Sequence, residues 1–198
     1  MLTMFKVEIV QLPKKVLRQK SKNVNIPLNK TNIELAEKMI YHIDDSQGPN
    51  TKFRPGVGVA AVQYGILKNV FYVCVPNDSR LTQRDSSQEV KPEDKYLFRD
   101  VIFNPEVIWK SDEMVAISQG EGCLSVDESW PNQEGLVRRH MEIKVKGYSY
   151  FQKKEMIWHV KGYVAIVFQH ELDHLNGMLF IDRIDPKRLW DKSGIKVL

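Results

Sequence analysis

The stretch that most constrains this chain is Phe168-Gln169-His170-Glu171-Leu172-Asp173-His174, at the end of an apolar run. The run predicts a helix over residues 163–175. On that helix His170 and His174 are four residues apart and share one face, so both imidazoles can reach one metal ion. Glu171 lies beside them, where a carboxylate can take a proton from a water molecule without binding the ion. The pattern is the H-E-x-x-H arrangement of zinc hydrolases and predicts a metal site.

A catalytic metal site needs a third protein ligand, and the sequence offers two kinds of candidate. After His174 the chain has no His or Glu, and Asp182 and Asp185 are the nearest carboxylates. Upstream, Glu121-Gly122-Cys123-Leu124-Ser125 supplies a cysteine, whose thiolate suits Zn(II) or Fe(II) beside two imidazoles. Three ligands leave a fourth position open for water. A downstream aspartate ligand would instead predict a metalloprotease.

A third alternative is a closed zinc site without catalytic function. It would need a fourth protein ligand, for which Cys74 and His159 are the candidates. Such a structural zinc module would bind RNA through its modest positive charge.

Composition favours a single domain over residues 1–198, and the predicted metal site would make it a catalytic one. The chain has 42% hydrophobic residues, enough for one core. Its net charge of +4 is spread along the sequence, which allows weak association with the ribosome but does not predict specific binding of nucleic acid. No apolar run is long enough for a membrane span or a leader peptide, so we expect a cytoplasmic protein. With only Cys74 and Cys123, a disulfide framework is not expected, and Cys74 is predicted to be a buried free thiol.

The periodicity of the chain predicts an α+β fold, with antiparallel sheets packed around a central, largely buried helix that carries the H-E-x-x-H motif. A first helix is predicted over residues 32–45, with a capping box at Thr31-Asn32-Ile33-Glu34. Strands are predicted at residues 70–75, 97–109 with a break at Asn104-Pro105, 113–118, 141–146, 155–160 and 195–198. Residues 77–95 are polar and charged and are predicted to form a surface insertion.

Small residues dominate Gly56-Val57-Gly58-Val59-Ala60-Ala61-Val62-Gln63. The letters match G-x-G-x-x-A, but the polar residues before them do not form the buried strand that a dinucleotide-binding turn requires. We interpret the segment as one that lets another chain approach the backbone closely.

Taken together, the segments 56–63, 121–125 and 169–174 resemble the three motifs of the peptide deformylases, in the same order. The resemblance spans about residues 10–185. Residues 77–95 and 130–133 look like insertions, similar to the longer, Gram-positive-like branch of that family. Arg138 stands where that family commonly has proline.

The resemblance implies a metallohydrolase that removes the N-formyl group from the N-terminal formyl-methionine of newly made polypeptides and releases formate. Cys123, His170 and His174 would hold one divalent metal ion. Fe(II) is often the physiological ion of the family, and Zn(II), Ni(II) and Co(II) suit the same ligands.

The resemblance also implies roles for other residues. Glu171 would be the general base and acid, and the Gln63 amide and the Leu124 backbone N–H would stabilise the oxyanion. Arg139 would pair with Glu121.

The substrate site is likewise implied by the resemblance. The methionine side chain would enter an apolar pocket formed by Tyr163, Ile166 and Val167. Val57, Gly58 and Gly122 would lie along the extended peptide. Asp173 is expected to face away from the ion and to accept hydrogen bonds from elsewhere.

Overall fold

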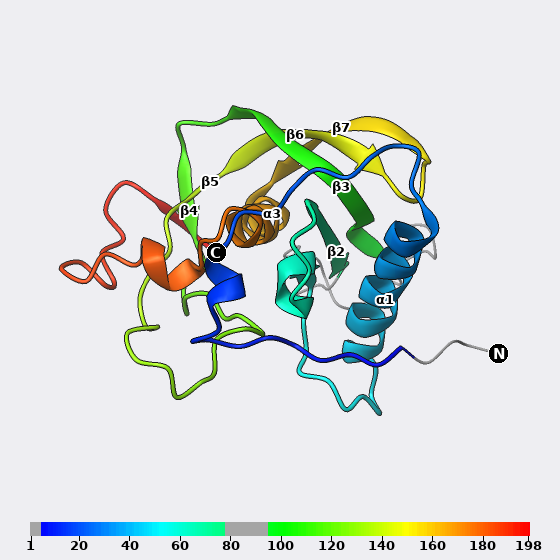
Figure 1. The fold of residues 1–198 in the computed structure, drawn as a ribbon. Coiled ribbons are helices and arrows are strands. Elements are labelled where there is room, and N and C mark those ends of the chain that lie inside the picture. Colours follow the sequence, from blue (N-terminus) through cyan, green and yellow to red (C-terminus); the bar gives the residue numbers. More distant parts are fainter. Residues whose placement is uncertain (1–4, 78–94) are drawn as a thin grey trace.

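The computed structural model describes residues 5–77 and 95–198 (Figure 1). Its helices are η1 (Lys15–Arg18), α1 (Lys30–Ser46), η2 (Ala61–Tyr64), α3 (Gly162–Leu175) and η4 (Phe180–Arg183). Its strands are β1 (Gly58–Ala60), β2 (Val70–Pro76), β3 (Tyr96–Lys110), β4 (Met114–Ala116), β5 (Arg139–His140), β6 (Glu142–Ser149), β7 (Lys154–Lys161) and β8 (Lys196–Val197). The predicted insertion at residues 77–95 lies almost wholly outside the described residues. Its two ends meet, since the Asn77 N–H donates to the Lys95 carbonyl at 2.9 Å.

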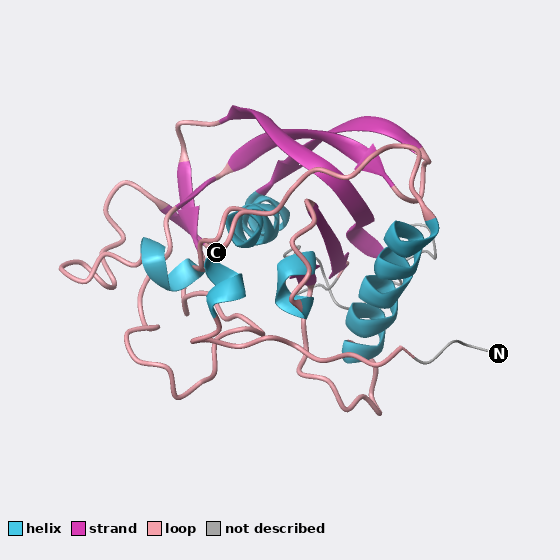
Figure 2. Cartoon of the chain, in the orientation of Figure 1, coloured by secondary structure: helices cyan, strands magenta, loops and turns pink. Residues whose placement is uncertain are grey.

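Two sheets frame the helix that carries the motif. The larger has the strand order β1-β2-β3-β6-β7 and is antiparallel throughout. The smaller has the order β5-β4-β8, in which β4 and β8 are parallel. Figure 2 shows the larger sheet in magenta arching over α3, with α1 to one side. The α+β class with a central helix is confirmed.

The apolar residues of helix α3 pack in the core of the protein. Ala165 and Phe168 are fully buried, and the Phe168 ring packs edge-on against Phe71 and Phe98, with centroids 5.3 and 4.8 Å away. The helix ends at Leu175 as predicted, followed by Gly177 with φ of +73°. Among the described helices, none has the length and apolar character needed to cross a membrane.

The first helix starts two residues earlier than predicted. The Asn29 side chain accepts a hydrogen bond from the Asn32 N–H at 3.0 Å, so Asn29 is the N-cap and α1 begins at Lys30. The predicted capping box based on Thr31 is therefore wrong. The expected apolar face is present, since Leu35 and Met39 are buried in the same cluster as residues of β2.

The predicted break at Asn104-Pro105 is also wrong, because β3 continues through it. Asn104 has φ of +51°, and the register of β3 shifts between Phe103 and Glu106. The Asn104 side chain is held by the Val24 backbone, accepting from its N–H at 2.8 Å and donating to its carbonyl at 2.9 Å. This bulge lets one strand pair with β2 in its first half and with β6 in its second.

The segment before α1 connects parts of the chain that are distant in sequence. Backbone N–H groups of Val10, Leu12 and Ser21 donate to carbonyls at 2.8, 3.0 and 2.8 Å. Their acceptors are Gln63, Ser125 and Leu175 respectively. The sequence predicts only an irregular arm here, whereas the structure ties that arm to all three motif regions.

The contact between this arm and the end of α3 predicts an unequal effect of alanine at two glycines. Gly177 and Gly194 have similar φ angles, +73° and +70°. A Cβ at Gly177 would lie 2.6 Å from the Arg18 carbonyl oxygen, whereas a Cβ at Gly194 would meet nothing within 4 Å. We expect Gly194→Ala to lower the free energy of unfolding by about 1 kcal/mol and Gly177→Ala by more than about 2 kcal/mol. Urea titration followed by circular dichroism measures both. Equal losses of unfolding free energy in the two variants would show that the Arg18 carbonyl does not restrict the space at Gly177.

Candidate metal centre

Three potential metal ligands converge from two segments that are distant in sequence. The helix α3 carries His170 and His174, and the loop before β5 carries Cys123. The Cys123 Sγ and the nearest ring nitrogens of the two histidines all lie within 4.8 Å of one another. The Cys123 Sγ is 3.2 Å from His174 Nε2, and the two rings have centroids 5.0 Å apart.

The donor set fits a divalent transition metal. An ion bonded to sulfur at ~2.3 Å and to imidazole nitrogen at ~2.0–2.1 Å needs donors clustered in this way. Within the described part of the chain, no fourth His, Cys, Asp or Glu joins the group. His174 is 1% exposed, and its Nδ1 has no hydrogen-bond partner among the described residues.

A buried ion pair connects the cysteine loop to α3. Arg139 Nε and Nη2 donate to the two oxygens of Glu121 at 2.8 and 2.9 Å, and the side chains are 1% and 5% exposed. His170 Nδ1 lies 2.9 Å from Glu121 Oε2, which leaves His170 Nε2 for a metal. Burial raises the pKa of Glu121, but hydrogen bonds from Arg139 and His170 outweigh it and lower the pKa to about 2. The carboxylate therefore stays charged.

Glu171 lies next to His170 with one oxygen unsatisfied. It is 3% exposed, and its Oε2 has no hydrogen-bond partner among the described residues. Burial raises the pKa of Glu171 to about 7, a value at which a carboxyl exchanges protons near neutral pH. Gly58 makes room for it, because a Cβ at that position would lie 2.5 Å from Glu171 Oε1.

Gln63 is oriented toward the cysteine by its backbone surroundings. Its Oε1 accepts from the Ala60 N–H at 2.9 Å, so its Nε2 points to Ser125 Oγ at 3.2 Å and lies 3.8 Å from Cys123 Sγ. The Leu124 backbone N–H has no hydrogen-bond acceptor among the described residues. Ser125 was given no role by the sequence, yet its own N–H points at the sulfur at 3.4 Å. Its position two residues after the cysteine is the signal that could have found it.

The predicted substrate residues differ in their surroundings: the apolar side chains are buried or partly buried, and Gly122 borders open space. Val57 and Tyr163 are partly buried against the cluster that contains Val167, while Ile166 is buried at 2% exposure. A Cβ added at Gly122 would meet nothing within 4 Å. The space beside this glycine is therefore open, as a passing peptide requires.

The alternative ligand sets do not assemble. Asp182 pairs with Arg18, and Asp185 pairs with Arg188 at 3.0 Å. Cys74 Sγ lies 3.7 Å from Gln47 Oε1, and His159 pairs with Glu142 at 2.7 Å. Each is held by a neighbour other than the three ligands, which argues against both the aspartate-ligated metalloprotease and the closed zinc module.

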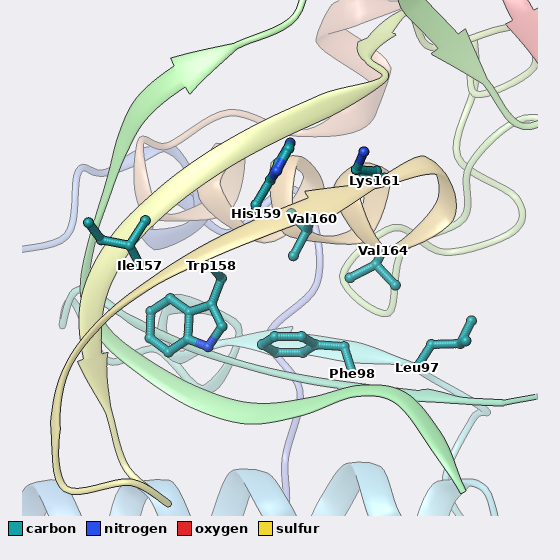
Figure 3. A pocket seen from close by; sticks show the side chains of 8 residues that line it. All are labelled: Leu97, Phe98, Ile157, Trp158, His159, Val160, Lys161 and Val164. Carbon is teal, nitrogen blue, oxygen red and sulfur yellow. The ribbon is translucent and has the colours of Figure 1, made fainter. Parts of the chain in front are cut away.

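A cavity of about 470 Å³ lies apart from the three potential metal ligands, between β3, β7 and the start of α3 (Figure 3). It is lined by Leu97, Phe98, Ile157, Trp158, His159, Val160, Lys161 and Val164. Phe98 and Trp158 meet edge to face there, with ring centroids 6.4 Å apart. Apart from His159, the candidate fourth ligand of a closed zinc site, none of the predicted site residues lines it.

Comparison with known proteins agrees with this geometry. The polypeptide deformylase family model matches residues 6–190. A peptide deformylase of Lactococcus lactis is 36% identical over 187 residues, which cover 92% of each chain. The structure of the Ehrlichia chaffeensis enzyme in complex with actinonin is 28% identical, with a TM-score of 0.71 over 93% of this chain and 92% of that one. That of the Acinetobacter baumannii enzyme with bound Met-Ala-Ser is 29% identical, with a TM-score of 0.68 over 90% and 98%.

The match covers nearly the whole chain and includes the segments that carry the three converging ligands. The chain therefore belongs to the polypeptide deformylase family and is a metal-dependent hydrolase that removes the N-formyl group from the N-terminal formyl-methionine of polypeptides, with release of formate.

Proposed function

We propose that Cys123, His170 and His174 hold the single divalent ion of this deformylase, with Fe(II) as the physiological metal and Zn(II), Ni(II) or Co(II) as working replacements. The observation that carries this assignment is the clustering of their three donor atoms within 4.8 Å. When bound, such an ion supplies a nucleophilic water near neutral pH and polarises the formyl carbonyl.

Glu171 is proposed as the general base and acid. It would take the proton of the attacking water and return it to the departing amine of methionine. Its free Oε2 and its place beside His170 support the role. Gly58 has no side chain that would collide with Glu171 Oε1. The Glu171 carboxylate can therefore lie against β1, close to a peptide that passes this strand.

Two donors are proposed for the oxyanion that develops on the formyl oxygen. One is Gln63 Nε2, whose direction is fixed by the hydrogen bond from Ala60 N–H to Oε1. The other is the Leu124 backbone N–H. Both are neutral and preorganised, so they stabilise new negative charge without competing for the metal.

The remaining proposed residues support the centre or contact the substrate. The buried pair of Glu121 and Arg139 supports the cysteine loop and orients His170. The methionine side chain is proposed to lie against Val57, Tyr163, Ile166 and Val167, with the peptide backbone beside Gly58 and Gly122. The Acinetobacter baumannii relative contains bound Met-Ala-Ser, a peptide that begins with methionine.

We also propose that the whole chain acts as one catalytic domain in the cytoplasm, where formyl-methionyl chains are made. Contacts of the N-terminal arm with all three motif regions support the single domain. The net charge of +4 supports at most a weak association with the ribosome.

The most direct test of Glu171 is the substitution Glu171→Gln. It keeps the shape of the side chain but removes the base, so we expect turnover of a formyl-methionyl peptide to fall by about 10²–10⁴-fold while the bound metal stays at one ion per chain. Anaerobic purification, metal analysis and a formate-release assay measure both quantities. Wild-type turnover in the metal-loaded variant would remove Glu171 from the mechanism, whereas loss of metal would point to a role in binding the ion.

Alanine at the two glycines beside the proposed peptide path separates catalysis from binding. A methyl group at Gly58 collides with the Glu171 carboxylate, while one at Gly122 meets nothing within the chain. We expect Gly58→Ala to lower kcat by about 10²-fold, because it displaces the base, and Gly122→Ala to raise KM with a smaller change in kcat. Steady-state kinetics on formyl-Met-Ala-Ser measure both. A silent Gly122→Ala would place the peptide elsewhere.

A further inference from the structure

The charged contacts of the metal centre do not stop at Glu121 and Arg139. Arg139 uses Nε and Nη2 for Glu121, and its remaining terminal nitrogen, Nη1, donates to Asp173 on α3. Asp173 lies one residue before His174 in the sequence but, as expected, accepts hydrogen bonds away from the ligand group. It is 6% exposed, and Arg139 is 2% exposed.

A second arginine completes the row. Arg183, at the end of η4, donates from Nε and Nη2 to the two oxygens of Asp173. Figure 1 shows η4 in orange beside α3. Arg183 follows Asp173 by ten residues in the chain. Side chains therefore touch in the order Arg183, Asp173, Arg139, Glu121, His170.

The charges in this row balance only when Arg183 is included. Glu121 and Asp173 carry two negative charges, and both contact the single buried cation of Arg139. Without Arg183, two buried carboxylates would share one guanidinium, and each would lack part of its compensation. Asp173 would then draw Arg139 away from its two-point contact with Glu121. Since Glu121 also bonds His170 Nδ1, that shift would loosen the imidazole.

We propose that Arg183 is a positioning residue for the metal centre, which acts through Asp173, Arg139 and Glu121 to fix the ring of His170. The inference rests on the proposed role of His170 as a metal ligand. It extends the set of residues that support the metal to the segment after α3, where no local sequence pattern predicts such a role.

The test measures Zn(II) affinity by competition with a chromophoric chelator, independently of turnover. Losing the direct partner of a metal ligand costs about 10–100-fold in metal affinity. Because Arg183 acts on His170 through three other side chains, we expect Arg183→Ala to weaken Zn(II) binding by about 10-fold, the lower end of that range. Arg188→Ala is the matched control, since Arg188 lies in the same segment and pairs with Asp185. It should change the affinity less than about twofold.

A second variant distinguishes positioning from simple anchoring of the segment. In the double variant Asp173→Asn/Arg183→Ala the uncompensated charge is gone, so Arg139 returns to Glu121 and most of the Zn(II) affinity should recover. If Arg183 only anchors the segment after α3, neutralising Asp173 restores nothing, and that result overturns the proposal. Equal Zn(II) affinities of Arg183→Ala and Arg188→Ala would overturn it as well.

Two further variants keep the test decisive. Should Arg183→Ala fail to fold, Arg183→Lys keeps the charge but loses the two-point contact, and its expected loss is about threefold to tenfold; an unchanged affinity contradicts the proposal. Cys123→Ala reports on the proposed metal site itself. If it binds Zn(II) like the wild type, the ligand assignment has failed, which is distinguishable from failure of the Arg183 proposal.

Discussion

The two oxygens of Glu121 join the parts of the molecule that must meet before any chemistry can occur. They accept hydrogen bonds from Arg139 and from His170, while Cys123 follows only two residues later. Holding this carboxylate therefore places the sulfur and one imidazole together, although they are distant in sequence. The Arg139 and Glu121 side chains are only 1% and 5% exposed, so loss of either partner would leave a largely buried charge uncompensated. This cost disfavours any arrangement in which Glu121 and Arg139 are separated.

Two buried polar atoms without a hydrogen-bond partner lie at the candidate metal centre. Buried polar groups nearly always have partners. Here Glu171 Oε2 and His174 Nδ1, both buried, lack one among the described residues, and they lie on adjoining turns of α3. The surrounding framework is held by its own hydrogen bonds. The strand β3 runs through a bulge held by Asn104, and the N-terminal arm bonds to each motif region. A rigid frame around a few open polar atoms is what a hydrolytic site requires.

Local patterns in the sequence predicted the helix of the motif, most strands and the three converging ligands, because each has its own periodicity or chemical signature. Two kinds of feature were missed. The first is a choice between neighbouring polar residues, since Asn29, three residues before Asn32, caps α1 in place of the predicted Thr31. The second depends on distant contacts, as where the Asn104 side chain bonds the Val24 backbone and turns the expected break into a bulge. Arg183 sits in a short exposed turn, and only the folded chain reveals its contact with Asp173. The roles assigned to the substrate pocket depended on the resemblance, since those positions look like ordinary core.

In the proposed centre one thiolate and two imidazoles bind an ion that keeps an open position. X-ray absorption spectroscopy on the anaerobically prepared, Zn(II)-loaded protein detects these ligands without relying on turnover. We expect one sulfur scatterer at ~2.3 Å with nitrogen or oxygen scatterers at ~2.0–2.1 Å, and loss of the sulfur signal in Cys123→Ala. We also expect an added hydroxamate to change the first coordination shell. A sulfur signal that survives Cys123→Ala, or a shell that does not respond to the hydroxamate, would contradict the proposed centre.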